Sequence, residues 1–182
     1  MKTMKVVIPG VLTTVQDLGR FGYQKSGMTC SGVMDTAAYR KANYLVGNEE
    51  GAAVLEMTFY GGSCRFEEDT VIALTGADMQ PTVNQKPIAM NQAVKIPAGG
   101  VLNLGMAKTG CRTYLSVAGG FEVPKVMGSY STNLKCGIGG HEGRALQMGD
   151  ELPIGEALHS WDEVKDRKVS VPDYPKEVLV SV

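Results

Sequence analysis

Glycine and proline recur so often along this chain that they limit the length of any element it can form. The 182 residues include 23 glycines and eight prolines, and both residue types favour turns and interrupt helices. The segments between them are short and rich in Val, Ile, Leu and Thr, which is typical of strands joined by tight turns. We therefore predict a mainly β domain, with strands at residues 4–8, 54–57, 62–66, 70–75, 93–96, 101–105 and 112–117.

Strands this short and this numerous favour a barrel or a sandwich. Polar turns are predicted at residues 83–86 and 96–100.

One segment has the pattern of a helix instead. Residues 35–46 read DTAAYRKANYLV, in which Ala38, Ala42 and Leu45 fall on one helical face. Asp35 stands where a helix N-cap belongs, and Gly47 stands where a left-handed C-cap residue is wanted.

Charge and composition exclude several classes of partner. Eighteen basic residues oppose nineteen acidic ones, and this balance argues against nucleic acid binding, which needs a concentrated basic field. No apolar run approaches the ~20 residues of a membrane helix. The first residues lack a secretory signal pattern, so we expect a cytoplasmic protein with reduced thiols. The four cysteines and two histidines have no metal-binding spacing, so no metal site is predicted.

The last part of the chain changes in composition. Residues 158–182 are rich in charge and include Pro172 and Pro175, which predicts an extended linker after a domain at residues 1–157. Residues 176–182 are apolar enough to begin a further strand. We expect them to start a truncated second half; the alternative is an edge strand of the same sheet.

Two loops contain candidate anion-binding groups. Arg20 could bind a carboxylate or phosphate bidentately, with Gln16 and Asp17 in the same glycine-flanked segment. The alternative is that Asp17 and Arg20 pair with each other and fix the loop. Ser31 and Asp35 lead into the predicted helix, whose N-terminus favours anions. The alternative there is a plain N-cap.

Further candidates lie in or beside the predicted elements. Glu56 stands in an apolar strand, so it is either a general base with a raised pKa or the partner of an arginine. Asn43, in the middle of the predicted helix, needs a specific hydrogen-bond partner, which a neighbouring loop backbone could supply. Asn48 follows this helix, and Thr75 and Gly76 end a predicted strand.

Residues 137–144 are the most glycine-dense part of the chain. Such loops can hold a phosphate or carboxylate through backbone N–H groups, and this one includes His141 and Arg144. The alternative for His141 is an exposed loop residue. Because no P-loop pattern is present, an independent nucleotide site is not predicted.

Four blocks resemble one protein family. They are GVLTTVQDLGRFGYQKSGMTCSGVMD at 10–35, ANYLVGNEEGAAVLEMTFYGG at 42–62, IALTGAD at 72–78, and YLSVAGGFEVPKVMGSYSTNLKCGIGGHEGRALQMGDEL at 114–152. Together they resemble the C subunit of bacterial 5-oxoprolinase, a family also called KipA, allophanate hydrolase subunit 2 or biotin-dependent carboxyltransferase-like. The chain departs from the usual pattern at Tyr130 and Asn133, where many members have other residues.

The resemblance implies a fold and a function. Full members have two cyclophilin-like β-barrel halves, so this chain would hold the first half, with one or two short helices. The implied function is that of one component of an ATP-dependent 5-oxoprolinase, which opens 5-oxoproline to glutamate. Its partners would be the KipI-like and LamB/YcsF-like components of the same enzyme, with ATP entering at the level of the complex. The isolated chain would be inactive.

Two other hypotheses about the function stay open. One is a KipA-like regulatory module that binds and sequesters a KipI-like kinase inhibitor. The other is the carboxyltransferase component of a urea carboxylase-like biotin enzyme, with the biotin carrier on another chain. For the enzyme reading, the predicted catalytic residues are Asp17, Arg20, Asp35 and Glu56, and the predicted substrate-binding residues are Gln16, Ser31, Asn43, Asn48, Thr75, Gly76, His141 and Arg144.

Overall fold

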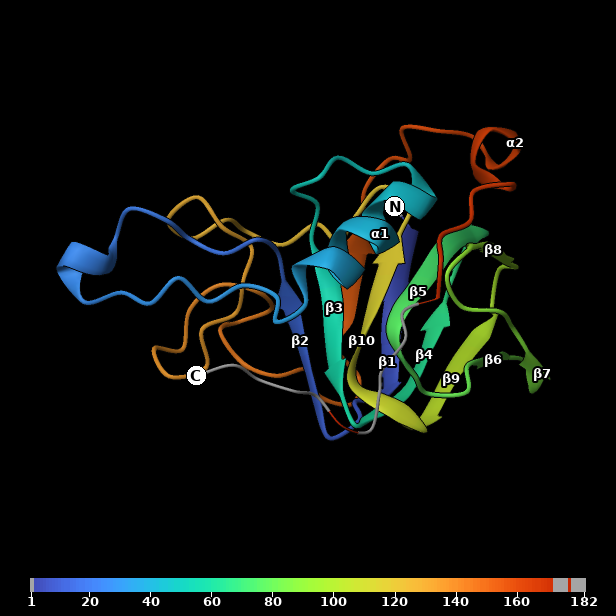
Figure 1. Ribbon diagram of the computed structural model, residues 1–182, viewed down its shortest axis with the longest axis horizontal. Coiled ribbons are helices and arrows are strands. Elements are labelled where there is room, and N and C mark those ends of the chain that lie inside the picture. The colour runs from blue at the N-terminus through green and yellow to red at the C-terminus, as the bar shows by residue number, and fades with distance from the viewer. Residues whose placement is uncertain (1, 172–176, 178–182) are drawn as a thin grey trace.

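The computed structural model describes residues 2–171 and 177, which form two antiparallel sheets with short helices around them (Figure 1). The first sheet has the order β11-β1-β4-β9-β6-β7. Its strands are β1 (Lys2–Ile8), β4 (Tyr60–Phe66), β6 (Thr82–Val83), β7 (Lys86–Pro87), β9 (Val101–Met106) and β11 (Glu151–Ile154).

The second sheet has the order β2-β3-β10-β5-β8. Its strands are β2 (Leu12–Gln16), β3 (Val54–Thr58), β5 (Thr70–Asp78), β8 (Ala93–Ile96) and β10 (Thr109–Val117). The helices are α1 (Thr36–Val46), α2 (Trp161–Val164) and the 3-10 turn η1 (Gln24–Ser26).

The mainly β fold with two short α-helices is confirmed, as are the seven predicted strands and the turn at residues 83–86. In the described part of the chain, the strands form two sheets without a ladder that closes them into one ring. Sequence patterns missed β2, β6, β7 and β11. The first of these contains buried Thr13, Thr14 and Gln16, so it lacks the apolar alternation that marks a strand.

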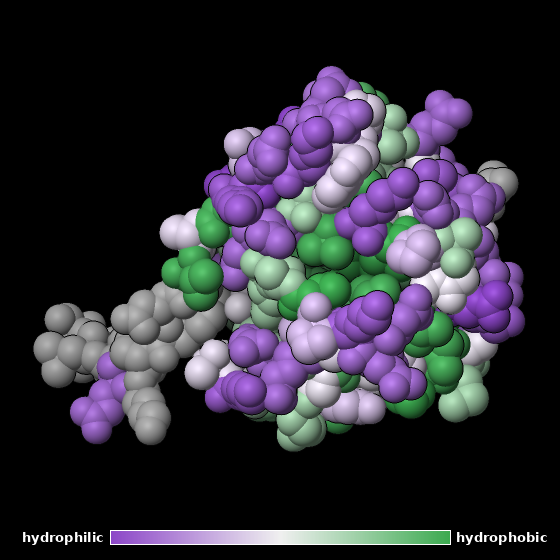
Figure 2. Space-filling view, turned by 90° about the vertical axis from the view of Figure 1, so that its right-hand side faces the viewer, coloured by the Kyte–Doolittle hydropathy of each residue, from purple (hydrophilic) through white to green (hydrophobic). Residues whose placement is uncertain are grey.

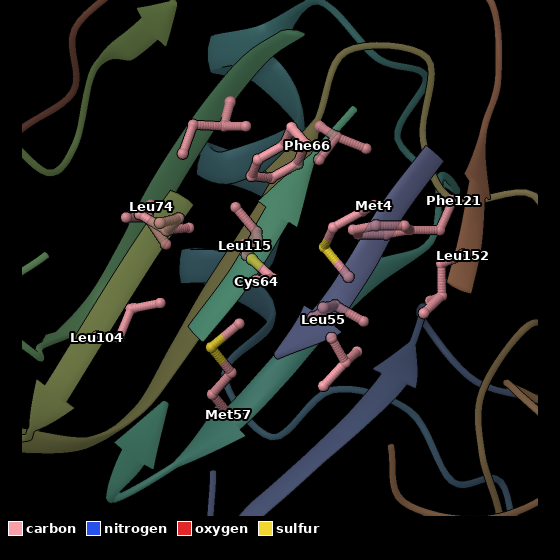
Figure 3. Close-up of a cluster of buried hydrophobic side chains, with 14 of the residues drawn as sticks. Met4, Leu55, Met57, Cys64, Phe66, Leu74, Leu104, Leu115, Phe121 and Leu152 are labelled. Atoms are coloured by element: carbon pink, nitrogen blue, oxygen red, sulfur yellow. The ribbon is translucent and has the colours of Figure 1, made fainter. Parts of the chain in front are cut away.

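The main core lies between the two sheets. Val15, Leu55, Leu115 and Leu74 are successive cross-strand neighbours on the inner face of the second sheet, and all are almost fully buried. Figure 3 shows Leu55, Leu74 and Leu115 in one cluster with side chains of the first sheet. One of these is Cys64, and burial raises the pKa of its thiol to about 12, so Cys64 serves as an apolar core residue.

Helix α1 covers the outer face of the second sheet. As predicted, it begins after the N-cap Asp35, whose Oδ1 accepts a hydrogen bond from the Ala38 N–H at 2.9 Å. It ends at Gly47, where φ is 76°. Its buried side chains pack on Val54 and Tyr114 of the sheet, so the predicted apolar stripe has a defined partner.

Residues 158–171 contact the two-sheet domain. Val164 of α2 is fully buried, and the Val169 N–H donates to the Asn91 carbonyl at 3.0 Å. The predicted linker and further half begin at residue 158, and their part beyond residue 171 falls almost wholly outside the described residues, so the domain boundary stays a prediction. Within the described ranges, neither α-helix is long and apolar enough to cross a membrane.

The core supports a stability prediction. Leu115→Ala is expected to lower the free energy of unfolding by about 2–5 kcal/mol, because it removes a fully buried side chain and leaves a cavity. Urea unfolding followed by circular dichroism measures the change. The same substitution at Leu158, which is 63% exposed, is expected to cost less than about 0.5 kcal/mol. Equal losses in the two variants would contradict this assignment of the core.

Candidate functional site

Asp17 joins the loop after β2 to the segment at residues 129–131. Its Oδ1 accepts hydrogen bonds from the Gly19 N–H at 2.8 Å and from the Ser129 and Ser131 hydroxyls, both at 2.6 Å. Its Oδ2 accepts from the Tyr130 N–H at 2.7 Å. A buried carboxylate with four donors is well compensated for its desolvation. Asp17 therefore holds two distant loops together and has no free oxygen for a substrate.

Arg20 fixes the same two loops through other partners. It is 1% exposed. Its Nη1 donates to the Ser31 hydroxyl at 3.1 Å, and its Nη2 donates to the Ser131 carbonyl. Among the described residues it forms no ion pair with Asp17 or any other carboxylate, so the two side chains stabilise the loop separately. The guanidinium lies too deep for the bidentate anion contact that its sequence context suggests.

Gln16 lies buried beside this cluster. Its Nε2 donates to the Thr14 hydroxyl at 3.0 Å and to the Thr132 carbonyl at 3.3 Å. Its Oε1 has no hydrogen-bond partner in the described part of the chain. The residue thus ties the end of β2 to residues 129–132.

Glu56 is the centre of a second polar group on the outer face of the second sheet. Its Oε2 accepts from the Met34 N–H and the Tyr114 hydroxyl, both at 2.8 Å, and its Oε1 lies 3.3 Å from Arg112 Nε. The predicted arginine partner is therefore present. The Tyr114 hydroxyl accepts in turn from the Asp35 N–H at 2.8 Å. Burial raises the pKa of Tyr114, which keeps this hydroxyl protonated and donating to Glu56.

The strand register explains why a glutamate occurs in this apolar strand. Thr14, Glu56, Tyr114 and Thr75 form one cross-strand row, and this row faces away from the core. Thr75 also reaches the helix, because its hydroxyl donates to the Ala38 carbonyl at 2.8 Å. Glu56 and Asp35 therefore position the start of α1 against the sheet.

Asn43 and Asn48 connect the end of α1 to β10. Asn43 Nδ2 donates to the Ala52 carbonyl at 3.0 Å, and its Oδ1 accepts from the Ser116 hydroxyl at 2.7 Å. Asn48 Nδ2 donates to the Val117 carbonyl at 2.7 Å. The loop-backbone partner expected for Asn43 is present, and both carboxamides have partners within the protein.

His141 and Arg144 form a third group around Asp150. Arg144 binds both oxygens of Asp150, at 2.7 and 2.9 Å, and also contacts Glu142 at 2.7 Å. The hydrogen bond from Arg144 holds the pKa of the Asp150 carboxyl below its usual range. His141 is partly buried, 3.5 Å from Asp150, so it is not the fully exposed loop residue that was the alternative.

The glycine-rich loop around His141 uses its own N–H groups. Gly137 donates to the Asn133 carbonyl at 2.9 Å, and Gly140 donates to the Tyr130 carbonyl at 2.8 Å. These two N–H groups are therefore not available to hold a phosphate.

A pocket lies elsewhere, between the end of β5, the β6–β7 hairpin and the turn before β10. Its volume is about 730 Å³. Figure 2 views the β6–β8 side, where hydrophilic side chains surround a depression with apolar side chains. Of the predicted site residues that the structure describes, Gly76 alone lines this pocket. Other lining residues are Asp78, Pro81, Ile88, Asn91 and Lys108.

The predicted site residues thus lie in several separate groups, most of which bind other parts of the protein. Their catalytic and substrate-binding roles stay predictions. Asp78 lies two residues after the predicted Gly76 at the end of β5, which continues through the TGAD segment where a turn was predicted. Asn91 and Lys108 come from loops without a recognisable pattern. Only the fold brings these three residues to one pocket.

The comparisons with known proteins agree on one family. The family model described as "Carboxyltransferase domain, subdomain A and B" matches residues 26–182. The chain is 46% identical to the 5-oxoprolinase C subunit of Escherichia coli over 165 residues, covering 91% of this chain and 53% of that protein. It is 40% identical to the urea amidolyase of Saccharomyces cerevisiae over 180 residues, covering 98% of this chain and 10% of that protein.

Solved structures share the fold. The urea carboxylase of Kluyveromyces lactis aligns with a TM-score of 0.81 at 38% identity, covering 94% of this chain and 15% of that one. The chain thus spans about half the length of the E. coli relative and a small part of the fungal proteins.

The Asp17 cluster generates a stability prediction. Asp17→Asn is expected to lower the free energy of unfolding by about 3 kcal/mol, because the new amide N–H₂ faces donors that have lost their acceptor. Chemical denaturation measures it. The same substitution at the exposed Asp162, whose partner is Lys165, is expected to leave the free energy of unfolding close to that of wild type. A stable Asp17→Asn protein would show that the cluster does not hold the loops.

The Asp150–Arg144 pair generates a pH prediction. Because the folded-state pKa of Asp150 is lowered, its stabilisation is complete above the unfolded-state pKa of about 3.9 and is lost as pH falls through the folded value. Wild type should exceed Asp150→Asn in free energy of unfolding by about 2 kcal/mol at pH 7. That difference should shrink below about pH 4.

Denaturation at a series of pH values tests this, with Arg144→Met as the matched change at the partner. The pH-dependent part of the free energy of unfolding should also be smaller in Arg144→Met than in wild type. A difference that stays constant down to pH 3 or grows there would contradict the expectation.

Proposed function

The chain belongs to the family of the carboxyltransferase domain, subdomains A and B, and on that premise we propose that it is one component of an ATP-dependent 5-oxoprolinase. The observation that supports this most is the 46% identity to the C subunit of E. coli 5-oxoprolinase across 91% of the chain. A second bacterial 5-oxoprolinase C subunit, from Haemophilus influenzae, is 40% identical over 139 residues. We infer the substrate and the existence of partner subunits from the names of these relatives; the kinds of partner follow from the family resemblance.

The proposed reaction opens a cyclic amide. The ring amide of 5-oxoproline is resonance-stabilised, so its hydrolysis benefits from activation by ATP. Transfer of the γ-phosphoryl group to the lactam oxygen releases ADP and makes the ring carbon a better electrophile. Water then adds to that carbon, and the C–N bond breaks with protonation of the nitrogen to give an acyl phosphate of glutamate. A second water hydrolyses this acyl phosphate to glutamate and phosphate.

We place the ATP step at the level of the complex with the KipI-like and LamB/YcsF-like partners. In this chain, the N–H groups of Gly137 and Gly140 are bonded internally, and Arg20 and Arg144 are committed to protein oxygens. These residues therefore offer no free cradle for a triphosphate. The proposed contribution of the chain is to hold the amide substrate and to complete the assembly, in the cytoplasm.

Carboxyl transfer is the second candidate function. It is favoured by the 40% identity to urea amidolyase across 98% of the chain and by the TM-score of 0.81 to a urea carboxylase. Urea and 5-oxoproline both present a carbonyl bonded to nitrogen, so one pocket chemistry would suit either. Carboxyl transfer would require a biotin carrier on another chain.

An assay of the assembled complex tests the choice. We expect the chain co-expressed with its KipI-like and LamB/YcsF-like partners to release glutamate from 5-oxoproline only when ATP is present, and the isolated chain to release none. Glutamate measured by an enzyme-coupled assay, with ADP in equal amount, is the readout. In parallel, urea, bicarbonate, ATP and a biotin carrier protein are supplied to the same complex.

The outcome of these two assays distinguishes the two candidate functions. An assembled complex that carboxylates urea and makes no glutamate would replace the first proposal by the second. Stable assembly with neither activity would contradict both and favour a regulatory, KipA-like binding role. Glutamate formation by the isolated chain would contradict the need for partners.

A further inference from the structure

We propose that the pocket beside β5 binds a small molecule that carries both an amide and an anionic group, such as 5-oxoproline. The choice of probe rests on the proposed function, but the site is inferred from the pocket itself. The pocket has a volume of about 730 Å³ and opens on the side of the molecule that carries the β6–β7 hairpin and β8. Its wall combines apolar and polar side chains, as small-molecule sites do.

Asn91 is the residue that points to a ligand. It is only 5% exposed, and its Oδ1 is buried without a hydrogen-bond partner. In the described part of the chain its Nδ2 makes no hydrogen bond either. Burying an amide oxygen without a partner is unfavourable, because its hydrogen bonds to water are lost and not replaced. A bound molecule with amide groups would supply the missing hydrogen bonds.

The backbone of Asn91 is fixed although its carboxamide is free. Its N–H donates to the Leu74 carbonyl at 2.8 Å, and its carbonyl accepts from the Val169 N–H at 3.0 Å. The carboxamide can still turn about its Cβ–Cγ bond, since no hydrogen bond from the described residues holds it. Either its N–H or its carbonyl can then face the pocket. Asn91 can therefore donate to a ligand carbonyl or accept from a ligand N–H.

The left-handed backbone conformation of Asn91 does not by itself explain why its side chain lacks a partner. Asn91 has φ of 59°, a left-handed value that asparagine tolerates well. Asn84 has a similar φ of 49°, but its Oδ1 accepts from the Val101 N–H at 3.0 Å. A left-handed turn in this protein thus provides a partner for one asparagine, whereas the asparagine in the pocket has none among the described residues.

Asp78 and Lys108 place opposite charges at the same pocket. Their backbones are joined, because the Lys108 N–H donates to the Asp78 carbonyl at 2.8 Å. Asp78 Oδ1 accepts from the Gln80 N–H at 2.8 Å. Within residues 2–171, neither side chain forms an ion pair. Lys108 can therefore attract a ligand carboxylate, and the second oxygen of Asp78 can accept from a ligand N–H.

These groups together specify a class of ligand. A lactam or other amide offers the carbonyl and N–H that Asn91 and Asp78 can bind, and a carboxylate offers a partner for Lys108. The apolar wall, which includes Pro81 and Ile88, suits the methylene groups of a small ring. 5-Oxoproline has all three features.

Binding of 5-oxoproline to the 182-residue chain, measured by isothermal titration calorimetry, tests the site. Asn91→Gly keeps the left-handed backbone and removes the carboxamide, so it should weaken binding about tenfold. Lys108→Ala should do the same. The matched controls are Asn84→Gly, at the other left-handed asparagine, and Lys135→Ala, at an exposed lysine away from the pocket; both should bind like wild type. Unfolding curves confirm that each variant is folded.

The ligand's own groups give a second comparison. We expect 2-pyrrolidinone, which lacks the carboxylate, and proline, which lacks the lactam carbonyl, to bind wild type at least about tenfold more weakly. Equal affinity of all three compounds, or no binding of 5-oxoproline to wild type, would overturn the proposal. So would unchanged affinity in a folded Asn91→Gly protein.

Assays of the assembled complex separate this inference from the proposed function. Glutamate formation with the same KM in wild type and Asn91→Gly would refute the pocket and leave the function standing. Binding that Asn91→Gly weakens, in a complex that forms no glutamate, would support the pocket and refute the function.

Discussion

The register of the second sheet is the constraint on which most of the structure depends. Strands β2, β3, β10 and β5 are aligned so that one row of side chains is wholly apolar and the next is polar or hydroxylated. The apolar row forms one wall of the core, and the polar row receives α1. Because side chains alternate, a shift of one residue would expose the leucines and bury Glu56. The same strand pairing therefore determines both the core and the surface on which α1 packs.

Buried polar groups, rather than apolar contacts, fix the long loops. Asp17 and Arg20 bind serine hydroxyls and backbone groups from residues more than 100 positions away along the chain. Such contacts are directional, so they define the loop conformation more narrowly than hydrophobic packing does. They also occupy both charged side chains with partners inside the protein, so this polar segment of the sequence stabilises the loop structure.

The sequence predicts the features that depend on near neighbours. The α1 helix is found from its stripe and its caps because these interactions span only a few residues. Strand β2 is missed because its polar Thr14 and Gln16 are buried, and the contact of Gln16 with Thr132 is one that no local pattern indicates. An arginine partner for Glu56 is expected from burial, but its identity as Arg112 follows only from strand pairing. Asn91 and Lys108 meet at a pocket through the fold alone.

The hydrogen bond between Asn91 and Val169 has a consequence for how the two-sheet domain communicates with the segment after α2. The peptide group that positions the pocket asparagine also holds the segment that leads from α2 toward the end of the described chain. Any displacement of that segment must alter the free energy of placing Asn91. By thermodynamic linkage, the occupancy of the pocket and the position of the segment then influence each other by the same amount. For a molecule bound in the proposed pocket, the hydrogen bond between Asn91 and Val169 would couple binding to the position of this segment.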